Sequence, residues 1–222
     1  MLIQVKLNMN KTIVFKKMSS EPGSPVRYYL DGFNMNFFLN RRISVKFEGF
    51  QCLNCKGYKP IFRQGFCQSC FFDSPATGDW IMRPELSKAH LGQEDRDLEY
   101  ESKMQLQPHV VYLALSSHLK VGVTRKSQLP TRWIDQGAHQ ATVLLEVPNR
   151  YLAGIGEVAL KNFFSDKTNW RKMLSGEPDS IDLLEVKSTL SEHVPENLKQ
   201  YICNDNSITN IKYPVLEYPT KI

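Results

Sequence analysis

Four cysteines in the first third of the chain have the spacing of metal ligands. They form two CxxC pairs, separated by eleven residues, within the stretch CLNCKGYKPIFRQGFCQSC: Cys52, Cys55, Cys67 and Cys70. Each pair can turn two sulfur atoms toward one point, and four thiolates complete a tetrahedral zinc shell with no open position. The pattern therefore predicts a structural zinc ribbon.

Two other uses of paired cysteines fit the sequence less well. Lys and Asn interrupt the apolar residues of the N-terminus, so we expect no secretory signal, and a reducing cytosol disfavours structural disulfides. A redox CxxC would be a single pair between a strand and a helix, whereas this chain has two pairs. We expect Cys203 to be an ordinary thiol and His90 not to bind metal.

Cations and aromatic rings alternate between the two cysteine pairs. The residues concerned are Lys56, Tyr58, Lys59, Phe62, Arg63 and Phe66. This mixture suits phosphate contact combined with base stacking, and it predicts that Lys56, Lys59 and Arg63 bind nucleic acid. The alternative is that Phe62 and Phe66 pack around the zinc site, because so small a module has little other core.

A second dense group of polar residues lies in the stretch KVGVTRKSQLPTRWIDQGA, residues 120–138, between apolar segments. The flanking sequence predicts strands at 109–115 and 118–124, a helix beginning in 129–138, and a third strand at 141–147. An amphipathic helix capped by Asn149 is expected to follow it. The predicted order is β-β-α-β-α.

This segment resembles the GIY-YIG nuclease domain, in which a hairpin carries two Gly/Tyr motifs, the next helix presents an arginine, and a later helix supplies a metal-binding glutamate. The motif VVY gives Tyr112 the place of the first tyrosine. The motif KVG keeps Gly122 but has Lys120 in place of the second tyrosine. Arg132 stands at the expected distance, and Glu157 occupies the metal-ligand position.

Two further positions can be compared with that family. Gln136 stands where the family often has a histidine, and Asn169 would match a polar residue found after the glutamate. The resemblance implies a catalytic set of Tyr112, Lys120, Arg132 and Glu157, in which Glu157 holds Mg²⁺, Arg132 clamps a phosphate oxygen and Tyr112 orients the attacking water. Lys120 adds a cation but cannot act on water as a tyrosine hydroxyl does. We therefore expect a site that binds a phosphodiester better than it cuts one.

Nucleic-acid contacts are also expected next to this set, at Arg125, Lys126, Arg132 and Trp133. Each residue has a purely structural alternative. Tyr112 could be a core tyrosine, Gly122 could serve only a tight backbone, and Arg132 could stack on Trp133 at the surface. Glu157 lies between apolar residues of its helix, where an unpaired carboxylate would be unfavourable, and this favours a functional role.

The combination of a four-cysteine ribbon with KVGVTR and RWIDQGA resembles, over about residues 45–176, a family of uncharacterised bacterial proteins known only as a domain of unknown function. That family has no settled activity. The resemblance therefore implies a bacterial source but no particular reaction.

The remaining sequence supplies the elements that must position these residues. Residues 3–7, 12–17, 26–39 and 43–50 are rich in β-branched and aromatic residues and predict strands, with a loop at 19–25. The fold class is α+β: an N-terminal antiparallel β unit with a four-cysteine zinc ribbon, followed by the GIY-YIG-like domain. The expected domains are 1–84 with the ribbon at 52–70, an acidic helical connector at 85–108, the GIY-YIG-like domain at 109–176, and a C-terminal helical extension at 177–222. The extension is expected to end in a strand at 213–218.

Charge is distributed unevenly along the chain. Residues 1–84 contain 12 Lys and Arg against 5 Asp and Glu, and residues 85–108 contain 3 against 6. The acidic residues from Glu94 to Glu101 are spread around a helix and are expected to form a solvated face. The basic N-terminal part can attract a polyanion, so DNA or RNA is the expected partner.

We expect no membrane span and a cytoplasmic protein, since no apolar run approaches the length of a bilayer. The leading hypothesis is a nucleic-acid-binding protein with structural zinc and a GIY-YIG-like phosphodiester site that has lost activity. An active Mg²⁺-dependent endonuclease and a protein-interaction scaffold are the alternatives. DNA or RNA preference and oligomeric state are left open by the sequence.

Overall fold

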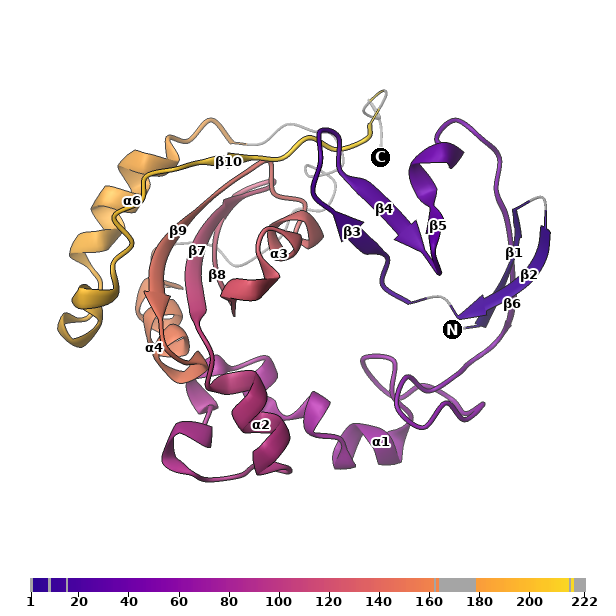
Figure 1. Ribbon diagram of the computed structural model, residues 1–222, viewed down its shortest axis with the longest axis horizontal. Coiled ribbons are helices and arrows are strands. Elements are labelled where there is room, and N and C mark those ends of the chain that lie inside the picture. Colours follow the sequence, from indigo (N-terminus) through magenta and orange to yellow (C-terminus); the bar gives the residue numbers. More distant parts are fainter. Residues whose placement is uncertain are drawn as a thin grey trace. The chain divides into compact units, whose positions relative to one another are not determined.

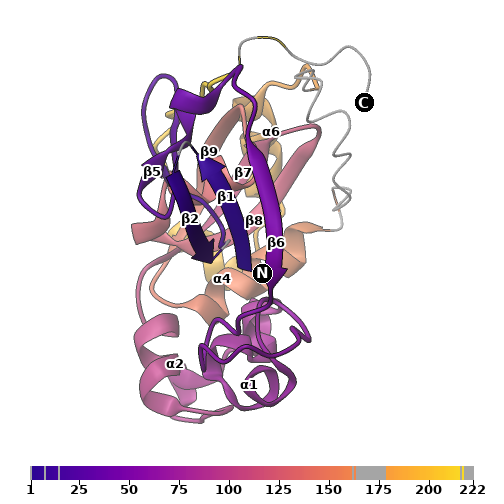
Figure 2. The ribbon, with the colours of Figure 1, turned by 90° about the vertical axis from the view of Figure 1, so that its right-hand side faces the viewer.

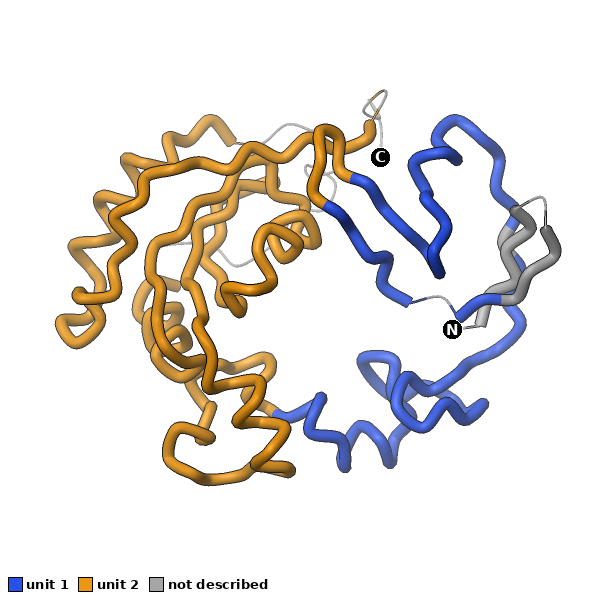
Figure 3. The backbone as a smooth tube through the Cα atoms, in the orientation of Figure 1, with its two compact units in different colours: residues 1–21, 27–78 blue, residues 22–26, 79–222 orange. Residues whose placement is uncertain are grey.

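The chain forms two compact units in a computed structural model, which describes residues 2–7, 9–14, 16–161, 163, 179–215 and 217. The first unit comprises residues 1–21 and 27–78, and the second comprises residues 22–26 and 79–222 (Figure 3). Asn169 and the end of the expected 109–176 domain lie outside the described residues.

The first unit contains two small antiparallel sheets. One has β1 (Leu2–Leu7) between β2 (Met9–Val14) and β6 (Ser44–Gly49), as Figure 2 shows. The other joins β3 (Ser19–Glu21), β4 (Arg27–Leu30) and β5 (Phe33–Asn34). The antiparallel β unit expected before the cysteines is therefore present.

The expected single strand over 26–39 is wrong, and so is the expectation that 19–25 is entirely a loop. A turn at Asp31 and Gly32, with φ values of 50° and 83°, separates β4 from β5, and a 3-10 helix follows at Met35–Phe38. Asn34 caps this helix, because its Oδ1 accepts from the Asn36 N–H at 2.9 Å. The apolar composition predicted a strand, but the Asp-Gly turn divides it.

The second unit begins with short helical turns, at Asp79–Ile81, Pro84–Leu86 and Ala89–Leu91, before α2 (Leu98–Gln105). Its acidic residues do not form the uniformly solvated face that the sequence predicted. Glu101 is only 1% exposed, and its carboxylate accepts the backbone N–H groups of Asp95, Arg96 and Asp97 at 2.9, 2.8 and 3.2 Å. Glu101 therefore fixes the chain that leads into its own helix.

A four-stranded antiparallel sheet forms the centre of the second unit. Its order is β10 (Thr209–Asn210), β9 (Gln140–Val147), β7 (His109–Leu115) and β8 (Leu119–Arg125). Together with α3 (Thr131–Asp135) and α4 (Arg150–Lys161), these strands follow one another in the expected β-β-α-β-α order. Every residue of β7 is buried, as its continuous apolar run requires.

Helices cover both faces of this sheet. In Figure 1, α3 lies on one side of β7 and β8, and α4 and α6 (Leu183–Glu192) lie on the other. Val111 and Leu113 of β7 pack with Leu160 of α4 and Leu183 of α6 in one buried cluster. Because strand residues alternate between faces, Val110, Tyr112 and Ala114 point to the side of α3.

Local sequence signals fix the ends of the helices. Asn149 caps α4 as expected, with its Oδ1 accepting from the Leu152 N–H at 3.0 Å. After α6, a 3-10 helix at Glu196–Tyr201 leads to β10. The strand expected at 213–218 is absent from residues 213–215, and the short β10 lies earlier instead. Among the described residues, no helix has the length and apolar character needed to span a membrane.

Candidate functional site

The four cysteines meet at one point in the first unit. Cys52 and Cys55 lie in a tight turn closed by the Lys56 N–H donating to the Cys52 carbonyl at 3.1 Å, with Lys56 in the left-handed region at a φ of 59°. Cys67 immediately precedes α1 (Gln68–Asp73), and Cys70 lies in its first turn. The second pair is thus carried by a helix, and not by a hairpin.

The sulfur atoms have the spacing of a tetrahedral metal shell. All four lie within 4.8 Å of one another, and the Sγ atoms of Cys55 and Cys67 are 4.0 Å apart. A Zn–S bond of about 2.3 Å places tetrahedral ligands about 3.8 Å from each other, so small shifts would complete the shell. These cysteines could therefore hold a zinc ion.

The surroundings act differently on the four thiols. A hydrogen bond from Asn54 lowers the pKa of Cys70, but burial and the neighbouring sulfurs raise it to about 11, whereas backbone N–H groups lower the pKa of Cys67 and of Cys52. Burial opposes the ionisation of Cys52, but N–H groups of Cys67, Cys55 and Asn54 point at its sulfur and lower its pKa to about 6. One of these contacts is the Cys67 N–H donating to Cys52 Sγ at 3.3 Å. Thiolates are the form that binds zinc, so the donor set and its surroundings fit a closed structural site.

An exposed aromatic surface lies beside the cysteines. Phe62 contacts Phe71 and Phe72 of α1, with ring centroids 5.4 and 5.7 Å apart, and Phe62 and Phe72 are 43% and 55% exposed. The Arg63 guanidinium carbon lies 5.2 Å from the centre of the Phe62 ring. Phe62 thus faces solvent as well as its neighbours, which differs from the alternative in which it only packs around the metal site.

The two lysines and the tyrosine of this module differ in their contacts. Lys56 Nζ donates a hydrogen bond to the Leu53 carbonyl, whereas the side chains of Tyr58 and Lys59 are exposed. Phe71 and Phe72 were not among the predicted contacts. The signal for them is the aromatic pair that directly follows the last cysteine, in QSCFFD.

Tyr112, in the second unit, is fully buried, and its hydroxyl donates to Gln136 Oε1 at 2.8 Å. Its ring lies against Gly122 in the neighbouring strand, where an added Cβ would approach the Tyr112 hydroxyl oxygen to 2.6 Å. Gly122 is therefore required for this close approach. Gln136, which the sequence comparison set against a frequent histidine of the GIY-YIG family, takes part in this arrangement as the acceptor for the Tyr112 hydroxyl.

Charged groups on two helices act on this tyrosine. Burial raises the Tyr112 pKa, the Arg132 guanidinium lowers it through charge and hydrogen bonding, and the Glu157 carboxylate raises it. Arg132 is exposed, while the next residue, Trp133, is buried and meets the Tyr112 ring edge-on at a centroid distance of 6.2 Å. The structural alternative, a stack of Arg132 on Trp133 at the surface, does not fit a tryptophan that is buried.

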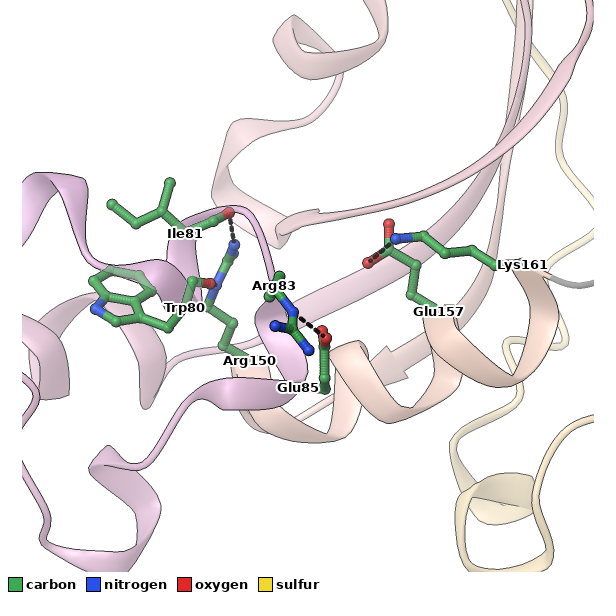
Figure 4. Close-up of polar contacts among 7 residues, drawn as sticks. All are labelled: Trp80, Ile81, Arg83, Glu85, Arg150, Glu157 and Lys161. Atoms are coloured by element: carbon green, nitrogen blue, oxygen red, sulfur yellow. Dashed lines mark hydrogen bonds and ion pairs between the residues drawn. The ribbon is translucent and has the colours of Figure 1, made fainter. Parts of the chain in front are cut away.

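Glu157 is nearly buried in α4, at 8% exposure, but it has an ionic partner (Figure 4). Its Oε2 lies 3.6 Å from Lys161 Nζ, one turn along the same helix. Burial raises the pKa of Glu157, and the charges of Lys161 and Arg150 oppose this rise. The Glu157 carboxylate is therefore not unpaired, because Lys161 balances its charge within the same helix.

Arg150 is a charged group near Glu157 that sequence reasoning missed. Its guanidinium donates to the carbonyl oxygens of Trp80 and Ile81, at 3.1 and 2.7 Å, and lies over the Trp80 ring (Figure 4). Burial lowers its pKa to about 10, and the charge of Glu157 opposes this shift. Its place directly after the helix-capping Asn149 is the only sequence signal for it.

The remaining predicted residues lie along β8 and just beyond it. Lys120 shares the sheet face of Tyr112, because it pairs with Ala114 two residues from the Tyr112–Gly122 pair. Arg125 donates to the Met104 sulfur at 3.3 Å, and the Lys126 ammonium lies 2.6 Å from Glu146 Oε1. Tyr112, Arg132 and Glu157 thus form one electrostatic neighbourhood, whereas Arg125 and Lys126 have structural partners.

Comparison with known proteins gives one match. A family model described as protein of unknown function (DUF2797) matches residues 40–222, which extends beyond the segment expected from the sequence motifs. No curated protein and no solved structure matches the chain.

Proposed function

We propose that this chain, which belongs to the family described as protein of unknown function (DUF2797), is a nucleic-acid-binding protein whose four-cysteine module is held by structural zinc. The observation that carries the proposal is the pair of exposed rings of Phe62 and Phe72, which contact the half-buried Phe71, with Arg63 against the Phe62 ring.

Exposed rings beside cations match the chemistry of a single strand. Every base has a π face, so stacking on aromatic side chains does not depend on sequence, and cations beside the rings contact the phosphates. The 12 Lys and Arg against 5 Asp and Glu in residues 1–84 supply the attraction. The module then binds unpaired nucleotides through Phe62 and Phe72 and their backbone through Lys59 and Arg63.

The test compares two kinds of variant for binding to a labelled single-stranded oligonucleotide over a range of salt concentrations. Phe62→Ala with Phe72→Ala should lower the affinity about tenfold or more, because stacking contributes about 1–3 kcal/mol per base. The slope of affinity against salt should stay unchanged. Lys56, Lys59 and Arg63 replaced together by Ala should instead flatten that slope.

Phe37→Ala is the matched control, because Phe37 is 72% exposed in the same unit but lies outside the aromatic surface. Its affinity should equal that of the wild type. Two results would contradict the proposal: an oligonucleotide affinity that does not change with salt concentration, or an affinity that is the same in the Phe62→Ala, Phe72→Ala variant as in the wild type.

A second function is favoured by the neighbourhood of Tyr112, Arg132 and Glu157: a phosphodiester site of the GIY-YIG kind. Glu157 would hold Mg²⁺ there, which supplies Lewis-acid chemistry at a phosphate. Arg132, exposed on α3, would bind the phosphate. The Tyr112 hydroxyl is buried and donates to Gln136, so Tyr112 would hold Gln136 in place and would not orient a water itself. The Lys161 partner of Glu157 and the lysine at position 120 both support weak cleavage or none.

A cleavage assay in Mg²⁺ and in Mn²⁺, on single-stranded, duplex and branched DNA and on structured RNA, separates the two functions. We expect little or no cutting, with Glu157→Ala leaving oligonucleotide affinity unchanged. Glu146→Ala is the control for loss of a paired carboxylate elsewhere in the same unit. Robust cutting that only Glu157→Ala abolishes would make the chain a nuclease.

A further inference from the structure

Gln136 ends helix α3 in a backbone arrangement that fixes its position. The Gly137 N–H donates to the Ile134 carbonyl at 3.0 Å, and the Ala138 N–H donates to the Trp133 carbonyl at 3.1 Å. Gly137 lies in the left-handed region, with a φ of 67°. This is the Schellman pattern that commonly ends a helix. Gln136, the residue before the glycine, therefore keeps a helical backbone, and its Cα–Cβ bond leaves α3 in a defined direction.

The Tyr112 hydroxyl fixes the other end of this side chain. It donates to Gln136 Oε1 at 2.8 Å, from a fully buried ring that contacts Gly122 and Trp133. Hydrogen bonding from the Arg132 guanidinium also reaches this hydroxyl, and a guanidinium can only donate. The proton of the hydroxyl therefore goes to the amide oxygen of Gln136, and the amide nitrogen is directed away from Tyr112.

The amide nitrogen of Gln136 keeps two protons to donate. Within the described parts of the chain this nitrogen has no acceptor, and it is not a buried atom without a partner. Gln136 is half-buried, so solvent reaches the nitrogen. An amide whose oxygen is held by the core and whose nitrogen is accessible presents a donor in a fixed place.

Arg132 brings a second donor to the same place. It precedes Gln136 by four residues, about one helical turn, so the two side chains share a face of α3. Both also meet at the Tyr112 hydroxyl, which Gln136 contacts directly and Arg132 affects through charge and hydrogen bonding. Arg132 is exposed, and no carboxylate among the described residues forms an ion pair with it. Its charge is therefore available to an anion.

The neighbouring charges leave one positive charge for a ligand. Glu157 is the carboxylate that acts on Tyr112, and Lys161 Nζ lies 3.6 Å from its Oε2 and balances it. The donors of Arg150 are held by two backbone carbonyls. One guanidinium, that of Arg132, and one neutral amide thus remain, which matches the single charge and the two non-bridging oxygens of a phosphodiester.

We infer that Gln136 is a phosphate-binding residue: its amide nitrogen donates to one non-bridging oxygen of a phosphodiester while Arg132 binds the other. Tyr112 is then a positioning residue, which acts on the ligand only through Gln136. The inference rests on the second proposed function, the phosphodiester site, and adds to it the group that orients the phosphate. Because a neutral amide does not take up a proton near neutral pH, Gln136 cannot serve as a base, which accords with weak cleavage or none.

The test uses the full zinc-loaded chain, labelled with nitrogen-15, and the dinucleotide thymidylyl-thymidine at about 150 mM salt, where distant charges are screened. The side-chain amide signal of Gln136, identified by its absence from Gln136→Met, should shift as the dinucleotide is added. An analogue with a neutral methylphosphonate linkage has the same bases and should leave the signal in place. This measurement on the wild type does not depend on the folding of any variant.

Three variants separate contact with the phosphate from positioning. Gln136→Met keeps the length of the side chain without its donor and should weaken dinucleotide binding about tenfold. Gln136→Glu still accepts from Tyr112 but replaces the donor with a negative charge, so it should weaken binding further. Tyr112→Phe should weaken binding in the wild type and have no effect in Gln136→Met, because it acts through the amide. A merely structural tyrosine would lower both affinities equally.

Gln128→Glu is the matched control. Gln128 Oε1 also accepts from a hydroxyl, that of Thr124 at 3.0 Å, so the substitution introduces the same charge at a similar hydrogen bond in the same unit. Its dinucleotide affinity should stay within about twofold of the wild type, because salt screens a charge at that separation. Thermal unfolding of each variant shows that it is folded.

The possible failures can be told apart. Dinucleotide binding that Arg132→Gln abolishes and the Gln136 variants leave unchanged would overturn the inference and leave the phosphodiester site standing. Binding of inorganic phosphate without binding of the dinucleotide would overturn the assignment to a phosphodiester. Absence of binding by either probe would remove the site together with the inference, whereas oligonucleotide binding that depends on Phe62 and Phe72 would still support the leading proposed function.

Discussion

Single buried residues decide how the second unit responds to pH, and His109 is the clearest of them. It is fully buried, and its Nδ1 lies 2.7 Å from the Gln107 carbonyl oxygen, which requires a proton on that nitrogen. Its Nε2 has no partner among the described residues. Burial lowers the His109 pKa to about 4, and the charges of Arg150 and Arg125 add to this effect.

The consequence is a loss of stability in mild acid. The unfolded chain binds a proton at His109 below its ordinary pKa of about 6.5, whereas the folded chain does so only near 4. The free energy of unfolding should therefore fall as the pH drops from about 6.5 toward 4, by up to about 3 kcal/mol. Urea unfolding at several pH values measures this slope, which His109→Gln should flatten and His193→Gln, at an exposed position, should not. An unchanged slope in His109→Gln would show that other groups cause it.

For single residues, the sequence correctly predicted contacts between groups that lie close together along the chain. The two CxxC pairs predicted the cysteine cluster, and Asn149 predicted its own capping bond, because spacing alone determines both. Glu101 was expected in solvent, since its burial depends on residues 95–97 folding back onto it. The ion pair of Glu157 with Lys161 was overlooked although it is local.

Among the elements, α4 depends on two glycines that differ in what surrounds them. A Cβ at Gly154 would lie 2.5 Å from the Pro84 carbonyl carbon and closer still to the Glu85 nitrogen, both of them backbone atoms. A Cβ at Gly156 would meet the end of the Leu145 side chain at 2.8 Å. The first contact cannot be relieved by a rotamer change, and the second can.

We therefore expect Gly154→Ala to lower the free energy of unfolding by about 1–3 kcal/mol, since overpacking outweighs the gain in helix propensity. Gly156→Ala is the matched control and should cost less than Gly154→Ala, because only a flexible side chain has to move. Chemical denaturation of the two variants and the wild type gives the comparison. Equal effects at the two positions would mean that the segment at Pro84 and Glu85 is not packed tightly on α4.

The strands of the second unit were predictable because apolar runs of that length occur in buried strands. The error in 26–39 has a different origin, because two short strands and a helical turn share one aromatic composition there. The pairing of Ile202 and Thr209 with β9 could not have been foreseen, since these residues lie far from β9 along the chain.

The whole molecule consists of two units with different sources of stability. The second unit has a continuous apolar core between its sheet and the helices α4 and α6. Among the described residues of the first unit, the buried apolar cluster is small, centred on Ile13 and Leu30. A module with so little core depends on its metal, because zinc binding supplies folding free energy.

Chelation of zinc in the full chain should therefore release the segment around residues 52–73 and leave the second unit folded. Hydrogen exchange followed by mass spectrometry should show lost protection in peptides that contain the four cysteines and retained protection in β7 and β9. Cys203→Ser is the control for a thiol outside the cluster and should not change the pattern before or after chelation. Loss of protection in β7 on chelation would show that the two units fold as one.

The position of β8 at the edge of its sheet indicates a role for Lys120 in preventing strand pairing between copies. Among the described strands, β8 has a neighbour only on the side of β7, so the hydrogen-bonding groups of its outer edge are available to another strand. Edges of this kind lead to aggregation when two copies pair, and charged residues, lysine above all, oppose such pairing. Lys120, the second residue of β8, and Arg125, the last, give this edge two positive charges. We therefore expect Lys120 to oppose pairing of two copies through the outer edge of β8, a role that requires no catalysis.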